Sequence, residues 1–369
     1  MQDARFLTDI FQAGVRAVRG DIAVAHALSE LDITSPEQII AVGKAATAMA
    51  QPAHERFPDV PILIVTKYDH AQDAPEAADV IEAAHPVLDK NSLVAGERLL
   101  DVVSSMPQDS HLLVLVSGGA SALAEVPVDG LDLDGLKTRA QNMLASGADI
   151  HEMNAARKTL SRIKGGRLLS HFKGASVTTF AISDVEGDAL AVIGSGIGDA
   201  PQSPSFTFEP RIIASNAIAR SAAVTCAKTA GQTVITDQEI LYDDITVIGP
   251  RLAESLRNGA SGVHIWGGEP TVVLPENPGQ GGRNQALALL IAREIAGLKD
   301  IAVLVAGTDG TDGPTDAAGA IVTGQTWDES GQAALENADA GTWLAQKEAL
   351  LKTGPTGTNV MDLVIAIKK

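Results

Sequence analysis

Residues 301–322 read IAVLVAGTDGTDGPTDAAGAIV, an apolar run that passes directly into a loop of Asp, Gly and Thr. The run predicts one buried strand, with the loop at the edge of its sheet. In open α/β sheets, ligands bind outside the carboxyl ends of the strands, and oxygen-rich loops suit a hard cation such as Mg2+ that carries a phosphate. Asp309, Asp312 and Asp316 are therefore candidate metal ligands. A solvated turn explains them equally well, because Asp, Gly and Thr are ordinary turn residues.

Strand-sized apolar runs recur along the chain and alternate with helical patterns, which is typical of an α/β fold with a parallel sheet. Each run ends in Gly, Ser, Thr, Asp, His or Lys, so we expect polar loops to gather at one edge of the sheet. The six runs are residues 39–42, 61–66, 80–83, 112–116, 177–182 and 301–306.

The length of the chain favours two domains. Its 369 residues, 45% of them hydrophobic, can bury one large core or two moderate ones. The stretch PQSPSFTFEP at residues 201–210 predicts an exposed connection, and a second break near residues 242–250 places the boundary near residue 245. We therefore expect domains at residues 1–245 and 246–369. The second domain would contain strands at 264–266, 271–274, 301–306 and 362–367, with a helix from 284 to about 296.

The composition excludes several classes of function. A formal net charge of −18 argues against broad nucleic-acid binding, because phosphates need a basic face. Cys226 is the only cysteine, so neither an intrachain disulfide nor a cysteine-rich zinc site can form, and a cytoplasmic location fits best. The N-terminus is amphipathic, and no apolar run approaches the ~20 residues of a membrane span. We expect a soluble protein without a membrane anchor.

Four common catalytic motifs are missing. The chain has no GxxxxGK[ST] of P-loop enzymes and no GxGxxG of dinucleotide-binding proteins, since GSGIG at residues 194–198 has the wrong spacing. His151 and Glu152 lack the second histidine of helical zinc proteases. The sequence GASAL at residues 119–123 lacks the closing glycine of a nucleophile elbow. A nicotinamide cofactor and a serine hydrolase mechanism therefore both lose their usual support.

Two turns of the first domain could handle an anion. Ser117, Gly118, Gly119 and Ser121 belong to a turn between a strand and a helix, where backbone N–H groups can hold a phosphate or a carboxylate. A tight turn without a ligand explains them nearly as well. Lys44 lies at the start of another predicted helix, where a cation opposes the helix dipole unless an anion is also present. This mismatch favours a functional role for Lys44.

An arginine follows a glycine-rich loop in the second domain. Gly281 and Gly282 let the backbone approach a ligand closely, and Arg283 then begins a helix. The forked guanidinium of an arginine suits phosphoryl oxygens. A surface arginine in a flexible loop is the alternative, which the preceding Gly268 and Glu269 make less attractive.

Further charged residues have both a functional and a structural interpretation. Asp184 and Asp188 follow a strand and could hold a metal or accept a hydroxyl proton, although Asx turns explain either residue singly. Lys158 and Arg162 belong to a basic run and lie one helical turn apart. A solvated helix face is the more common explanation for such a run.

Seven motifs, in this order, closely resemble the glycerate 2-kinase family over nearly the whole chain. The resemblance implies a Rossmann-like α/β/α N-terminal domain, a smaller α/β C-terminal domain of the MOFRL type and an active site in the interdomain cleft. It also implies ATP-dependent phosphorylation of D-glycerate at its 2-hydroxyl, which gives 2-phosphoglycerate, with Mg2+. The motifs are GKAATAMA, VSGGASAL, SGADIHEMNAARKTLSRIKGGRL, SDVEGD, GGEPTVVLPENPGQGGRNQ, AGTDGTDGPTDAAGA and TGPTGTNVMDL.

The functional lysine and arginine of that family fall on Lys44 and Arg283, which stand inside matching motifs. The chain departs from the family pattern at Ala120, at Ile197 and at residues 241–244. The other roles are our own inference: Asp184 or Asp188 would orient the 2-hydroxyl, and the three aspartates of the acidic loop would hold Mg2+. We expect the substrate and the nucleotide to contact Ser117, Gly118, Gly119, Ser121, Asn154, Lys158, Gly268, Glu269, Gly281, Gly282 and Thr308.

Two other functions remain open at this point. Relatives of the family have been named hydroxypyruvate reductases, so an NAD(P)H-dependent oxidoreductase is the main alternative, although the dinucleotide fingerprint is missing. A non-catalytic sensor of glycerate or nucleotide is the other. A homodimer is compatible with the resemblance, but the residues do not decide the oligomeric state.

Overall fold

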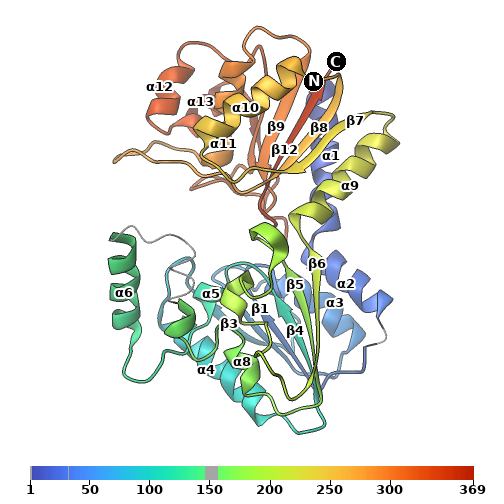
Figure 1. Ribbon diagram of the computed structural model, residues 1–369, viewed down its shortest axis with the longest axis vertical. Helices are drawn as coiled ribbons and strands as arrows, with labels where there is room; N and C mark the ends of the chain where they lie inside the picture. The colour runs from blue at the N-terminus through green and yellow to red at the C-terminus, as the bar shows by residue number, and fades with distance from the viewer. Residues whose placement is uncertain (1, 32, 146–156) are drawn as a thin grey trace. The chain divides into compact units, whose positions relative to one another are not determined.

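The structure is a computed structural model that describes residues 2–31, 33–145 and 157–369. The chain divides into two compact units (Figure 1). We call Arg19–Ser215 with Gly357–Asn359 the parallel-sheet unit. Met1–Val18, Asn216–Thr356 and Val360–Lys369 form the mixed-sheet unit. Among the described residues, no helix has both the length and the apolar character needed to cross a membrane.

The parallel-sheet unit contains six strands in the order β3-β2-β1-β4-β5-β6, and every neighbouring pair is parallel. This is the strand order of Rossmann folds. Strands are added outward on one side of β1 and then, from β4 onward, on the other side, so the strand order reverses between β1 and β4. The structure thus confirms the predicted α/β class. The strands are β1 (Gln38–Val42), β2 (Ile62–Lys67), β3 (Asp79–Ala83), β4 (His111–Val116), β5 (Ser176–Ile182) and β6 (Thr207–Ala214).

Helices cover both faces of the parallel sheet. α2 (Gly20–Glu30) packs on α3 (Ala46–Arg56), which lies against β1 and β2. On the other face, α4 (Lys90–Ser105) and α8 (Arg167–Ser170) close a core with the inward side chains of the central strands. Asp89 caps α4 through a capping box with Ser92. The unit also contains α5 (Ala120–Leu123), α6 (Leu133–Ala145), η1 (Glu186–Asp188) and η2 (Ile193–Gly196).

The mixed-sheet unit has the strand order β11-β10-β9-β12-β8-β7. Only the pair β7 and β8 is parallel within this sheet. β8 and β9 are buried along their whole length, because helices cover both faces. The strands are β7 (Val234–Glu239), β8 (Gly262–Gly268), β9 (Ile301–Gly307), β10 (Gly319–Thr323), β11 (Leu350–Leu351) and β12 (Asp362–Lys368).

The helices of this unit form two layers. α1 (Gln2–Ala17) and α9 (Asn216–Thr229) pack together against one face of the sheet, and α10 (Ile245–Asn258) and α11 (Arg283–Glu294) lie on the other. α12 (Gly331–Glu336) and α13 (Ala340–Gln346) pack beside α11. The predicted helix at 284–296 is therefore confirmed as α11.

The division of the chain differs from the expected boundary near residue 245. It falls between Ser215 and Asn216, and the first helix joins the mixed-sheet unit. The break expected at residues 242–250 contains the start of α10. The mixed-sheet unit also contains residues 216–245, because α9 packs on α1 and β7 pairs with β8.

Two predictions about this part of the sequence were wrong in whole or in part. Residues 201–206 form no helix or strand, as expected for a connection, but residues 207–210 belong to β6. Pro210 is tolerated because β6 is an edge strand that pairs only with β5. Residues 271–274 form no strand beyond an isolated bridge at Thr271, and Val273 is 86% exposed. Residues 301–306 belong to β9 of the mixed sheet, which confirms the strand expected there in the second domain.

Candidate functional site

The loops after β1 and β4 meet where the strand order of the parallel sheet reverses. The backbone N–H of Lys44 donates to the Gly118 carbonyl over 2.9 Å, and the N–H of Ala45 donates to Ser117 Oγ over 3.0 Å. Gly43 has φ +132, and a Cβ added there would lie 2.2 Å from Ser117 Oγ. Glycine is therefore required for this close approach. Open α/β sheets bind ligands at this position, so Lys44 lies at the expected place for a ligand.

Two glycines bring further side chains to the same place. A Cβ on Gly118 would lie 1.8 Å from Asp184 Oδ2, so this carboxylate rests directly on the Gly118 backbone. A Cβ on Gly119, whose φ is +85, would lie 3.0 Å from Lys44 Cγ and 3.2 Å from His85 Cδ2. Lys44, Asp184 and His85, which follow three different strands, thus converge around the Gly118–Gly119 turn.

The sequence did not single out His85. Burial, followed by the positive charges of Lys44 and Lys67, lowers the pKa of His85 to about 4. The imidazole is therefore neutral at pH 7, beside the positive charge of Lys44. Only the tertiary structure places it there, because His85 follows β3, which is the edge strand of the sheet and is not adjacent to β1 or β4.

Ser121 is fixed by a second residue that the sequence did not single out. Its Oγ lies 2.8 Å from Ser195 Oγ, and Ser195 is buried with a left-handed φ of +59. The helix that follows the Ser117 turn, α5, has only four residues. Its dipole is therefore small, and the predicted anion site depends on the loop backbone and on Lys44 more than on a helix N-terminus.

Asp188 and Lys158 were also predicted in this unit, and both have structural contacts. Asp188 has a left-handed φ of +52 in η1, and its N–H donates to the Val185 carbonyl over 3.3 Å. The Lys158 carbonyl accepts from Arg167 over 2.6 Å, and its side chain lies along Gly165. Asn154 lies outside the described residues. Ligand contacts for these three residues stay predictions.

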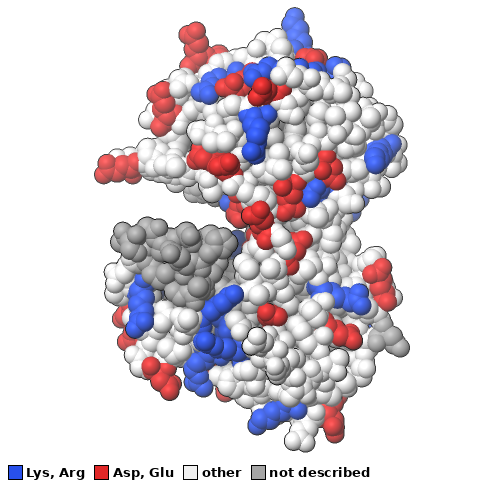
Figure 2. Space-filling model, in the orientation of Figure 1, with Lys and Arg blue, Asp and Glu red and all other residues white. Residues whose placement is uncertain are grey.

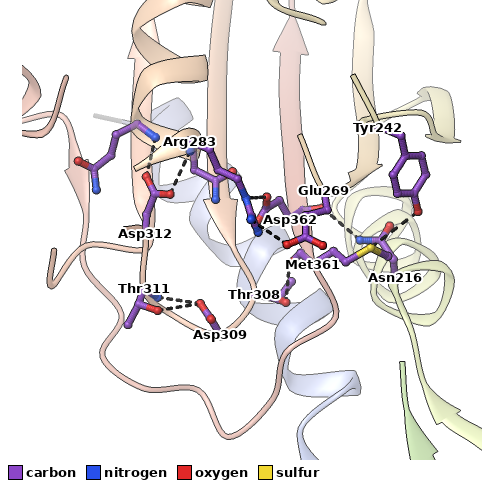
Figure 3. Close-up of polar contacts among 12 residues, drawn as sticks. Asn216, Tyr242, Glu269, Arg283, Thr308, Asp309, Thr311, Asp312, Met361 and Asp362 are labelled. Atoms are coloured by element: carbon purple, nitrogen blue, oxygen red, sulfur yellow. Dashed lines mark hydrogen bonds and ion pairs between the residues drawn. The ribbon is translucent and has the colours of Figure 1, made fainter. Parts of the chain in front are cut away.

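The mixed-sheet unit holds Arg283 between two carboxylates (Figure 3). Nε of Arg283 donates to Asp362 Oδ2 over 2.7 Å, and Nη2 donates to Asp362 Oδ1 over 3.3 Å. Nη1 lies 2.8 Å from Glu269 Oε1. Burial lowers the pKa of Arg283, but the nearby Asp362 and Glu269 carboxylates outweigh it and the net pKa is raised. The guanidinium therefore remains charged.

Asp312 caps the helix that begins at Arg283. It is only 3% exposed, and its two oxygens accept from the backbone N–H groups of Asn284 over 3.0 Å and Gln285 over 2.7 Å. Burial raises the pKa of Asp312 to about 7 against these hydrogen bonds, which lower it. A Cβ on Gly282 would lie 2.2 Å from Asp312 Oδ1, so the glycine lets the loop fold over the carboxylate.

The other residues predicted in this loop also form local contacts. Asp309 Oδ1 accepts from the N–H of Thr311 over 3.0 Å and from its hydroxyl over 3.1 Å (Figure 3). Asp316 is exposed and forms an ion pair with Lys352 over 2.8 Å. The buried hydroxyl of Thr308 donates to the Met361 carbonyl over 2.6 Å, which joins the end of β9 to the start of β12.

The three aspartates of the acidic loop have different local contacts, and metal binding by any of them stays a prediction. In the described ranges, no group of three or more His, Cys, Asp and Glu side chains could hold a metal ion. Asp312 is used as a helix cap, and Asp316 is paired with a lysine. Asp309 accepts the hydrogen bonds of its turn through Oδ1 alone. Of the three aspartates, it therefore best fits a cation that takes most of its ligands from phosphate and water.

The predicted glycines Gly268 and Gly281 shape the backbone around Arg283. Gly268 has φ +133, and Gly281 has φ +154. A Cβ on Gly268 would lie 2.9 Å from the Leu241 backbone, which is part of the segment that departs from the family pattern. Both glycines are thus required by conformation or by close packing, whether or not a ligand binds there.

The strand order and these two clusters define a class, namely a Rossmann-like α/β unit combined with a mixed α/β unit that presents a charged arginine. Residues 6–225 match the family model described as a domain of unknown function, DUF4147, and residues 262–362 match the MOFRL family. A D-glycerate 2-kinase from Thermotoga maritima is 34% identical over 97% of this chain and 97% of its own. The chain belongs to the glycerate 2-kinase family.

Other comparisons agree with this family. A crystal structure of glycerate kinase from Thermotoga maritima is 32% identical, with a TM-score of 0.91 over 100% of both chains. A relative from Agrobacterium vitis carries a provisional name as a hydroxypyruvate reductase; it is 33% identical over 97% of this chain and 92% of its own.

Proposed function

We propose that this protein is a kinase that transfers the γ-phosphoryl group of ATP to the 2-hydroxyl of D-glycerate, giving 2-phosphoglycerate and ADP. The main support within the chain is the convergence of Lys44 and Asp184 on the Gly118–Gly119 turn, where the strand order of the parallel sheet reverses. Family membership supports the reaction, because relatives across nearly the full length are named glycerate 2-kinase or glycerate kinase.

The proposed mechanism relies on positioning and charge neutralisation. Phosphoryl transfer requires little covalent chemistry from the protein, and cationic side chains can neutralise the charge on the transferring group. Lys44 and Arg283 supply these cations. Asp184 would accept the proton of the 2-hydroxyl as the hydroxyl oxygen attacks. Lys44 and Arg283 belong to different units, so their joint action on one phosphoryl group is part of the proposal.

The divalent cation is also part of the proposal. ATP-dependent kinases use Mg2+ to neutralise the nucleotide phosphates, and Asp309 is the residue of the acidic loop that we assign to it. Binding of Mn2+ in the presence of ADP, followed by electron paramagnetic resonance, tests this without an activity assay. Asp309→Asn should weaken Mn2+ binding, whereas Asp316→Asn should not. Equal binding by the wild type and Asp309→Asn would contradict the assignment.

A coupled assay tests the reaction directly. Enolase and pyruvate kinase, added without a phosphoglycerate mutase, report the 2-phospho isomer alone. We expect a signal from the purified protein with ATP and D-glycerate. A signal that requires the mutase would make the enzyme a 3-kinase, and the absence of ADP formation would favour a sensor.

Hydroxypyruvate reduction is the alternative. The Rossmann strand order and the name of the Agrobacterium vitis relative favour it. The turn after β1, however, reads GKAATA, without the glycine pattern that lets a pyrophosphate approach the helix. Oxidation of NADH by the protein with hydroxypyruvate would support the reductase, and we expect none. A cytoplasmic location and a homodimer stay proposals as well.

A further inference from the structure

Asp362 is a buried charge to which the proposed mechanism gives no role. It is the first residue of β12 and pairs in register with Gly268 of β8 and Gly307 of β9. Its exposure is only 1%, and its main described side-chain partner is Arg283, which it contacts through both oxygens. A buried carboxylate is costly unless it is paired, so its presence at this position requires an explanation.

The surroundings of Asp362 fix the direction of its carboxylate. Its backbone carbonyl accepts from Asn216 Nδ2 over 3.1 Å, which anchors the start of β12. A Cβ on Gly307 would lie 3.3 Å from Asp362 Oδ1, so the neighbouring strand limits the side chain on that side. The carboxylate is therefore a rigid acceptor whose orientation is determined by the sheet.

The guanidinium of Arg283 meets this acceptor with one edge only. Nε and Nη2 face Asp362, while Nη1 faces Glu269, which is 46% exposed (Figure 3). Arginine carries five N–H donors in a planar fork, so fixing the Nε edge also fixes the direction of the others. An exposed ion pair such as that with Glu269 is weak, and an anion can replace it.

We infer that Asp362 is a positioning residue, which holds the Nε edge of Arg283 so that the Nη1 edge can bind a phosphoryl oxygen in place of Glu269. The inference rests on the proposed kinase function. It assigns to Asp362 an effect on turnover that acts only through Arg283. If Asp362 were only structural, its substitution would lower stability, and the effect on kcat would be the same whichever residue occupies position 283.

The test combines variants at positions 362 and 283. Asp362→Asn should lower kcat for D-glycerate by about 10- to 100-fold, because a small misplacement of a reacting group is sufficient for such a loss. KM for glycerate should change little. In the Arg283→Lys background, which lacks the planar fork, the same Asp362→Asn change should lower kcat by less than about twofold, since coupled residues are not additive.

A matched control removes a different carboxylate from a buried arginine of the same unit. Asp237 forms an ion pair with Arg220, and Asp237→Asn should leave kcat and KM unchanged. If Asp362→Asn does not fold, Asp362→Glu keeps the charge but moves the carboxylate, and the same loss of kcat is expected. Thermal unfolding of each variant separates loss of structure from loss of turnover.

The outcomes separate this inference from the proposed function. Wild-type kcat for Asp362→Asn, together with an impaired Arg283→Lys, overturns the inference alone. An equal loss from Asp362→Asn in both backgrounds also overturns it. Full activity of Arg283→Lys and Arg283→Ala would instead remove Arg283 from the proposed reaction.

Discussion

At the scale of the residue, Lys44 is the side chain on which the proposed chemistry most depends. Its backbone is held by Gly118, and its side chain lies over Gly119. Lys44→Met removes the charge and keeps the apolar stem. We expect kcat to fall by about 10^2- to 10^3-fold, as for other donors that stabilise a transition state. The enolase-coupled assay measures it, with the exposed Lys173→Met as the control; near wild-type turnover would refute the role.

A second prediction at this scale concerns the buried pair of Lys164 and Glu125. Lys164 Nζ lies 2.5 Å from Glu125 Oε2, and the two side chains are 1% and 2% exposed. Burial lowers the pKa of Lys164, and Glu125 opposes this shift. Lys164→Met would leave the Glu125 carboxylate buried without its cation, so the free energy of unfolding should fall by about 3–5 kcal/mol. Urea denaturation measures this change.

The double variant serves as its control. Lys164→Met with Glu125→Leu removes both charges, and it should recover most of the lost stability because no unpaired charge remains. Equal stability of the wild type and the Lys164→Met variant would contradict the prediction.

At the scale of the element, the cap of α11 should make stability depend on pH. Burial raises the pKa of Asp312 to about 7 in the folded protein, against 3.8 for an unperturbed aspartate. Between these values the folded state binds more protons than the unfolded state, so stability falls as pH rises. The loss is roughly 1.4 kcal/mol for each pKa unit and is complete above the folded pKa.

Urea denaturation between pH 4.5 and pH 8, a window set by this shift, checks the prediction. Asp312→Asn cannot ionise and should lose this part of the pH dependence. Asp316→Asn alters an exposed carboxylate of the same loop and should preserve it. Parallel stability curves for the wild type and Asp312→Asn would show that Asp312 does not titrate in this range.

At the scale of the whole molecule, the mixed-sheet unit is assembled from both ends of the chain. α1 covers β9 and β12, and α9 and β7 pack on β8. A fragment of residues 246–369, the domain expected from the sequence, lacks all three elements. We expect it to be unfolded by circular dichroism and heteronuclear NMR. Residues 1–18 joined by a flexible linker to residues 216–369 should fold, and the reverse result would contradict the division.

Charge is also a property of the whole molecule. The net charge of −18 is spread over both units, and acidic and basic side chains are interspersed on the face drawn in Figure 2. The charge close to a site therefore says more about anion binding there than the net charge of the chain does. Lys44 and Arg283 are cations whose surroundings, a glycine turn and a pair of carboxylates, were not visible in the composition.

The sequence by itself determined the α/β class and the family. It also determined the strands that consist of apolar runs and the helix that begins at Arg283. These features depend on local periodicity, turn residues and motifs, which the chain carries within short windows. The sequence did not predict the edge strand β6, because its mostly exposed residues have no such pattern. The sequence also did not predict that Asp312 caps a helix, because a carboxylate in a glycine-rich loop is compatible with a cap, a turn or a metal ligand.

Only the tertiary structure decided which distant residues meet. It placed His85 and Asp184 on the turn that holds Lys44, and Asp362 on Arg283. It also joined the first helix to the last strand. The physical reason is that such contacts depend on the order of strands in a sheet and on the burial of charge, and both are set by long-range packing that no short stretch of sequence contains.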